Sequence, residues 1–145
     1  KKISKQKIPQ NGNVRIGETV IFHFIANRDG YLTIVDIQPG GDVVILYPND
    51  FSTDGKVASG RKYTIPGEED GFDITVSEPS GTDTIVVFFT NKKVDWLDPK
   101  ILTGEGFKTV KEGEKAMASR SFTVTATKLK SRDWESLPYT IEVVK

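Results

Sequence analysis

The residues with the best chance of doing acid–base chemistry are one histidine and several groups of carboxylates. His23 is the only histidine, and a histidine can act as a general base. It lies among apolar residues at 20–26, and the chain has neither a cysteine for it to activate nor a Gly-x-Ser-x-Gly motif. We therefore interpret His23 as a structural or surface residue, and we predict no catalytic residue and no cofactor.

A loop rich in oxygen-bearing side chains is the strongest metal candidate. Asp50, Ser52 and Asp54 have the spacing that opens an EF-hand calcium loop. The twelfth position of such a loop should be a glutamate, and here it is Arg61. A different calcium site could use Asn49, Asp50 and Asp54. The alternative is an Asx turn, in which Asn and Asp bond their own backbone.

A second acidic group lies at 68–73. Glu68, Glu69 and Asp70 are consecutive, and Asp73 follows closely. Glycosidase chemistry needs two carboxyl groups that face each other across a cleft, which adjacent residues of one turn do not do. We interpret Glu68, Glu69 and Asp70 as a solvated loop and as a candidate contact for a partner.

Two tryptophans could serve as stacking platforms for sugar rings. Trp134 precedes the last predicted strand, and we expect it to pack in or near the core. Trp96 lies near Leu97, Ile101 and Leu102. It either anchors this stretch to the core or marks a contact surface, so it remains a candidate for ligand or partner binding.

Composition excludes several classes of protein. Twenty basic residues balance twenty acidic ones in 145 residues, which argues against a nucleic-acid binder. The absence of cysteine excludes disulfides and zinc–thiolate sites. The longest apolar run is 85–89, far below the roughly 20 residues of a membrane span. The chain begins with Lys1, so we interpret it as a mature or excised part of a longer protein.

Short apolar or alternating runs separated by turns dominate the chain. The runs at 20–26, 31–37 and 43–47 are joined by short turns, which predicts an antiparallel meander. The run 84–90 is almost continuously apolar, as in a buried central strand. Further strands are predicted at 62–65, 72–76, 121–127 and 139–143, with Phe122, Val124 and Ala126 facing inward.

The stretch 91–120 is polar and contains Pro99 and three glycines. We expect it to be a long irregular or partly helical excursion, with a short helix within 108–119. The spacing of the strands predicts one all-β domain over 1–145, an antiparallel β-sandwich of the immunoglobulin-like kind. A small barrel is the alternative.

The order of several turns and strand ends resembles a known family. The relevant segments are Asp29-Gly30-Tyr31-Leu32, Tyr47-Pro48-Asn49, Ile65-Pro66, Glu78-Pro79-Ser80-Gly81 and the strand 84–89. Over about residues 14–90 they are similar to the bacterial domain of unknown function 4384, although Tyr47 stands where that family usually has phenylalanine. The resemblance implies an accessory β-domain of a larger bacterial protein, often outside the cytoplasm.

Three functions remain open at this point. The first is a non-catalytic interaction module that contacts a protein partner or neighbouring domains through the loops 48–61, 66–71 and 91–120 or through an exposed edge strand. The second is a carbohydrate- or cell-wall-binding module, which depends on the two tryptophans. The third is a carboxylate-based hydrolase, which requires two acidic residues in a cleft with pKa values pushed apart. We favour the first, in the cell envelope or secreted, without nucleic acid and without membrane insertion.

Overall fold

A large mixed sheet forms the middle of the molecule. The computed structural model describes residues 3–6, 12–52, 54–67 and 70–145. The order of the large sheet is β11-β12-β6-β5-β10-β13-β2, and β7 pairs with β5 beside this path. The strands are β2 (Asn13–Arg15), β5 (Gly30–Ile37), β6 (Val43–Tyr47), β7 (Lys56–Val57), β10 (Gly81–Thr90), β11 (Leu102–Thr103), β12 (Lys108–Val110) and β13 (Trp134–Val144). Neighbours are antiparallel except β13 and β2, which are parallel.

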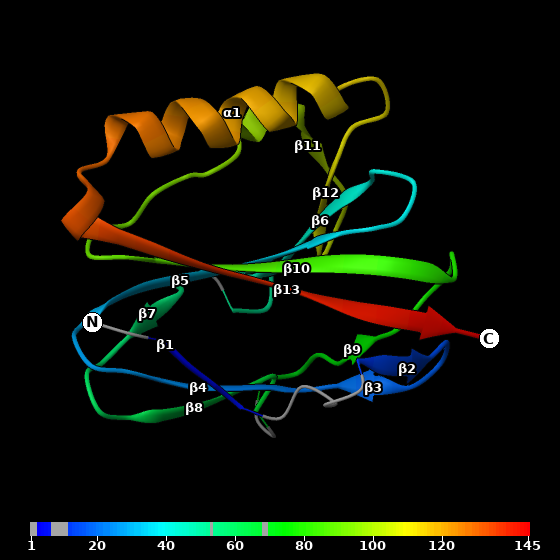
Figure 1. The fold of residues 1–145 in the computed structure, drawn as a ribbon, viewed down its shortest axis with the longest axis horizontal. Coiled ribbons are helices and arrows are strands. Elements are labelled where there is room, and N and C mark those ends of the chain that lie inside the picture. Colours follow the sequence, from blue (N-terminus) through cyan, green and yellow to red (C-terminus); the bar gives the residue numbers. More distant parts are fainter. Residues whose placement is uncertain (1–2, 7–11, 53, 68–69) are drawn as a thin grey trace.

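Smaller sheets face one side of the large sheet (Figure 1). One has the order β1-β4-β8, and the other pairs β3 with β9. Their strands are β1 (Ile3–Gln6), β3 (Thr19–Val20), β4 (Phe22–Ala26), β8 (Lys62–Ile65) and β9 (Ile74–Thr75). The chain is thus mostly β with two facing β layers, as the sequence predicts.

A helix covers the other side of the large sheet (Figure 1). Helix α1 (Lys115–Lys128) follows η1 (Pro99–Ile101) and the β11–β12 hairpin, and η2 (Ser131–Asp133) leads into β13. The predicted strand at 121–127 is therefore wrong, and the helix lies later than the expected 108–119. The excursion 91–120 is partly helical, as expected, but it also contributes two strands to the sheet.

Packing explains why this β-branched sequence is helical. Ala118, Phe122 and Ala126 recur every four residues and pack on the large sheet, whereas Val124 is 49% exposed. The hydroxyls of Thr123 and Thr127 donate to the carbonyls four residues earlier, at 3.2 and 2.7 Å. The inward direction predicted for Val124 is therefore wrong, because it follows from a period of two.

The predicted meander is also wrong in one respect. Strands β5 and β6 form an antiparallel hairpin, but β4 pairs with β1 and β8 in the opposite sheet. The turn after β4 thus crosses between layers and does not join neighbours. Gly30 is needed at this crossing, because a Cβ there would lie 2.5 Å from the Phe89 ring and from the Thr90 carbonyl oxygen.

The central strand β10 has a core on both faces. It lies between β5 and β13, which confirms the prediction of a buried central strand at 84–90. Ile85, Val87 and Phe89 point into the core between the β layers, and Phe88 points into the core beneath α1. The inner face of β10 also forms one wall of the candidate site.

Candidate functional site

A cavity of about 470 Å³ lies between the β layers. Val44, Leu46, Ile85, Ile141 and Val143 line it from the large sheet. Val20, Phe22, Ile74 and Val76 line it from the opposite side. Most of these side chains are aliphatic and stand on strands, so the walls are apolar and held in place by backbone hydrogen bonds. The volume falls within the usual range of small-ligand sites, about 300–1,000 Å³.

Two aspartates from neighbouring strands interrupt this apolar wall. Asp36 on β5 pairs with Ile85 on β10, and Asp83 lies two residues before Ile85. Residues two apart on a strand share a face, so Asp36 and Asp83 are diagonal neighbours on the cavity side. Both line the cavity. Asp36 falls in the predicted strand 31–37 and Asp83 just before the predicted strand 84–90, and neither was predicted as a site residue.

The two carboxyl groups interact strongly. Asp83 is only 6% exposed and Asp36 is half-buried. Burial, a hydrogen bond with Asp83 and the charge of Asp83 raise the pKa of Asp36 from 3.8 to about 8. Burial also raises the pKa of Asp83, although its hydrogen bond with Asp36 works in the opposite direction. Asp36 therefore keeps its proton at neutral pH and can donate it to Asp83.

Each of these carboxyl groups has an oxygen without a donor from elsewhere. The Oδ1 atoms of Asp36 and Asp83 are inaccessible, and apart from the proton that the pair shares, no donor in the described part of the chain reaches them. Buried polar atoms usually have partners, because leaving one unpaired costs about 1–3 kcal/mol. The two carboxyl groups therefore depend on the hydrogen bond that they make with each other, which needs the proton that Asp36 retains.

Two further titratable side chains line the cavity. His23 stands on β4, and its Nδ1 lies 3.2 Å from the Thr64 hydroxyl. Glu18 is exposed and accepts a hydrogen bond of 2.6 Å from the Arg15 amide. No lysine or arginine is among the lining residues that the structure describes. The cavity is therefore acidic in a protein whose formal net charge is zero.

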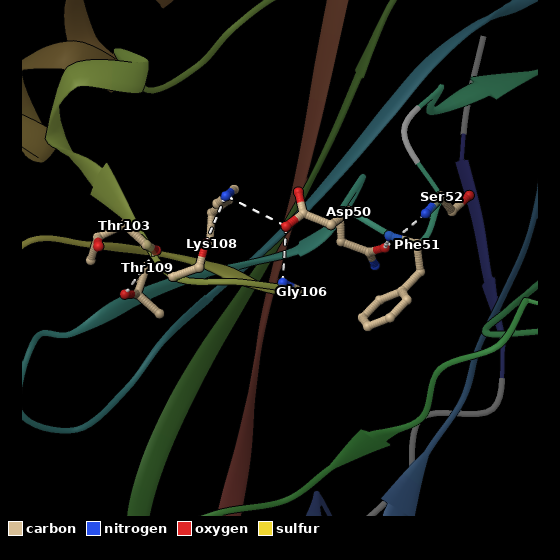
Figure 2. A network of polar contacts seen from close by, with 9 residues as sticks. Asp50, Phe51, Ser52, Thr103, Gly106, Lys108 and Thr109 are labelled. Carbon is tan, nitrogen blue, oxygen red and sulfur yellow. Dashed lines mark hydrogen bonds and ion pairs between the residues drawn. The ribbon is translucent and has the colours of Figure 1, made fainter.

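The calcium candidates have other partners. Asn49 is buried, and its side-chain oxygen accepts from the amides of Phe51 and Ser52, both at 2.9 Å. This is an Asx turn, the alternative to the calcium interpretation. Asp50 turns toward the β11–β12 hairpin, where it accepts from the Gly106 amide at 2.9 Å (Figure 2).

Charge pairing holds Asp50 in this direction. Lys108 Nζ lies 3.5 Å from the same carboxylate oxygen, and Asp54 is exposed. Across residues 3–6, 12–52, 54–67 and 70–145, no group of three histidine or acidic side chains could hold a metal ion. The structure thus connects loop 48–55 to the hairpin through Asp50 and does not gather Asn49, Asp50 and Asp54 into one site.

The second acidic group is only partly described. Glu68 and Glu69 lie outside the described residues. Asp70 Oδ2 accepts a hydrogen bond of 2.6 Å from the Gly67 amide. The carboxyl groups that the structure brings together are Asp36 and Asp83, and the role of Glu68, Glu69 and Asp70 as a partner contact stays a prediction.

The tryptophans pack beneath helix α1. Trp96 is 3% exposed and stacks on Phe88 with 4.0 Å between ring centroids. Trp134 is half-buried and lies 5.4 Å from Trp96, which agrees with the core or near-core position expected of it. The Ser121 hydroxyl donates to the Trp96 carbonyl at 2.9 Å. Trp96 thus anchors the excursion, and no sugar ring could stack on its buried face.

Comparison with known families gives one match. Residues 13–93 match the family model described as domain of unknown function DUF4384. The chain belongs to the DUF4384 family. The match confirms the resemblance and extends its bounds by one residue at the start and three at the end. Comparisons with curated proteins and with solved structures give no match.

The DUF4384 match contains most of the candidate site. It runs from β2 to just beyond β10, so it includes both Asp36 and Asp83. Phe107, Ile141 and Val143 complete the cavity from outside the matched range. In the described ranges, none of the helices has the length and hydropathy needed to cross a bilayer.

Proposed function

We propose that this DUF4384 domain is a non-catalytic accessory module of a larger bacterial protein, in the cell envelope or secreted, and that it binds a ligand between its β layers. The observation that carries this proposal is the cavity of about 470 Å³. Its apolar walls stand on paired strands, which supports a preformed binding site rather than a gap between mobile loops.

Thermal unfolding of the full chain against a panel of small apolar and amphiphilic compounds tests this function. A ligand at about 100 times its Kd adds about 2.7 kcal/mol to the free energy of unfolding. That gain raises the Tm of a domain of this size by several degrees. Val44→Phe, which extends a half-buried cavity residue into the space, should remove the shift. If no compound shifts the Tm of the wild type, ligand binding in the cavity is refuted.

A protein partner is the second element of the proposal. Loop 48–61 carries the exposed Phe51, which stacks on Phe72 at 5.7 Å. Phe107, from the stretch 91–120, lines the cavity and packs edge-on against Phe72. Co-purification of the domain with neighbouring domains of its parent protein, compared between the wild type and Phe51→Ser, tests this contact. The immunoglobulin-like form of the sandwich and the carbohydrate-binding alternative stay predictions.

A carboxylate-based hydrolase is a second candidate function, favoured by one observation. Asp36 and Asp83 are two acidic residues in one cavity, and their environment raises the pKa of Asp36 to about 8. Paired carboxyl groups that share a proton can activate water. Hydrolysis of peptide or glycoside substrates that is lost in Asp83→Asn would support this candidate. The absence of turnover by the folded wild type would remove it.

A further inference from the structure

We propose that the cavity binds a small amphiphilic primary amine, with its ammonium group between Asp36 and Asp83 and its hydrocarbon body against the aliphatic walls. This inference rests on the proposed function, because it specifies the chemical class of the ligand. Three observations support it: the sign of the charge in the cavity, the dependence of the aspartate pair on a hydrogen-bond donor, and the apolar character of most of the remaining wall.

The charge of the cavity favours a cation. Its described titratable groups are Asp36 on β5, Asp83 on β10, Glu18 before β3 and His23 on β4. The described lining residues of β6, β9 and β13 contribute aliphatic side chains, Thr75 and no charge. An anionic ligand would face acidic groups without a lysine or arginine to balance it. A cation would meet an opposite charge in a partly desolvated site, where charge interactions are screened less than in bulk water.

The acceptors favour a primary ammonium over other cations. The carboxyl groups of Asp36 and Asp83 are hydrogen-bonded to each other, and their Oδ1 atoms have no donor from the other described residues. Asp83 is only 6% exposed, and it lines the cavity. A primary ammonium has three N–H donors and can serve both carboxyl groups at once. A quaternary ammonium carries the same charge but no donor, so it could not replace the proton that links the two carboxyl groups.

The walls set the rest of the ligand. Beyond the aspartates most of the lining is apolar, with aliphatic side chains from both β layers and with Phe22 and Phe107, although polar residues such as Asn13, Gln38 and Ser77 also line it. A hydrocarbon chain placed against the apolar part leaves water, which favours binding. A linear or branched hydrocarbon chain attached to the amine therefore matches this part of the site better than a polar group.

Binding should release a proton. At neutral pH Asp36 holds a proton, and the ammonium group replaces that proton between the two carboxyl groups. The affinity for the amine should therefore rise with pH, by at most tenfold per unit, until Asp36 ionises in the free protein near pH 8. The amine itself stays charged over this range, because a primary amine such as that of the lysine side chain has a pKa of about 10.4.

Four probes of matched length test the proposal on the full chain. We would titrate n-hexylamine, 1-hexanol, hexanoate and n-hexyltrimethylammonium by calorimetry and by amide chemical shifts at pH 6, 7 and 8. We expect n-hexylamine to bind at least tenfold more tightly than each other probe, with shifts at the amides of Asp36 and Asp83. The preference should fall in Asp36→Asn and Asp83→Asn, and it should persist in the exposed control Asp73→Asn.

The outcomes separate this inference from the proposed function. If 1-hexanol binds as tightly as n-hexylamine at the cavity residues, the ammonium assignment is wrong and the cavity still binds ligands. If n-hexylamine binds but Asp36→Asn and Asp83→Asn keep the full preference, the aspartates do not hold the amine. If none of the four probes binds and a wider panel also fails, both proposals are refuted. Circular dichroism of each variant shows whether it is folded.

Discussion

Replacing Asp36 with asparagine should stabilise this protein at neutral and alkaline pH. Asparagine is close in shape to a protonated aspartate and can still donate to Asp83, but it cannot ionise. In the folded wild type, burial and the neighbouring Asp83 raise the pKa of Asp36 from 3.8 to about 8. Keeping a proton that the unfolded chain would release costs free energy, and Asp36→Asn removes that cost.

The sign and size of the effect follow from the two pKa values. Below pH 3.8 Asp36 is protonated in both states, so it does not penalise folding. As the pH rises toward 8, the unfolded chain loses this proton while the folded chain keeps it. The free energy of unfolding then falls by at most about 1.4 kcal/mol per pH unit. The ceiling is about 1.6 kcal/mol at pH 5 and about 4.4 kcal/mol at pH 7, and titration of Asp83 with Asp36 lowers both.

The assay is urea unfolding of the wild type, Asp36→Asn and Asp73→Asn between pH 5 and pH 8. Fluorescence of Trp96 and Trp134 follows the transition, because both indoles pack beneath helix α1. The advantage of Asp36→Asn over the wild type should grow by about 1–3 kcal/mol from pH 5 to pH 7, whereas Asp73→Asn should follow the wild type. Parallel curves for the wild type and Asp36→Asn would show that the carboxyl group of Asp36 is not perturbed and would refute the reasoning.

Five other substitutions test the fold and the turn at Asn49. Gly30→Ala should lower the free energy of unfolding, measured in urea, by about 3 kcal/mol, because its methyl group would overlap the strand opposite. Gly40→Ala, with open space around it, should change this free energy by less than about 0.5 kcal/mol. Phe122→Ala should lower the free energy of unfolding by about 2 kcal/mol, and Val124→Ala should leave it almost unchanged. Equal losses for the two variants would contradict the orientation of helix α1. Asn49→Ala should lower the free energy of unfolding by about 2–3 kcal/mol, since it removes three hydrogen bonds from a buried turn. Adding calcium to the wild type should leave its Tm unchanged, and a rise would restore the calcium hypothesis.

The strands were predictable wherever one face is buried. The residues of β5 and β10 alternate between two cores, and their β-branched and aromatic content favours strands in either case. The turn at 27–30 was harder to interpret. A short turn ending in Asp-Gly is typical of a hairpin, yet here it carries the chain from one sheet to the other. Only pairing partners distant in sequence distinguish the two, and a single sequence does not show them.

Helix α1 and the aspartate pair escaped prediction for related physical reasons. The segment 121–127 fits periods of two and of four, and contacts of Phe122 and Ala126 with the large sheet decide in favour of the helix. Asp36 and Asp83 are 47 positions apart, and the register of β5 against β10 alone makes them neighbours. A possible signal was the position of Asp36, two residues after the buried Ile34 on an otherwise apolar face.

The parallel pairing of β2 with β13 has a consequence for how the domain folds. Val14 and Val143 are partners in that pairing, and both line the cavity. Contacts between such distant positions form slowly, because a long loop of chain must lose conformational entropy before these contacts can stabilise the fold. The family match at 13–93 stops before β13, so a fragment cut at those bounds would leave β10 with a bare edge and the cavity with an open wall. Ligand binding would therefore serve as a readout of completed folding, since the site exists only after the C-terminal strand has docked beside β2.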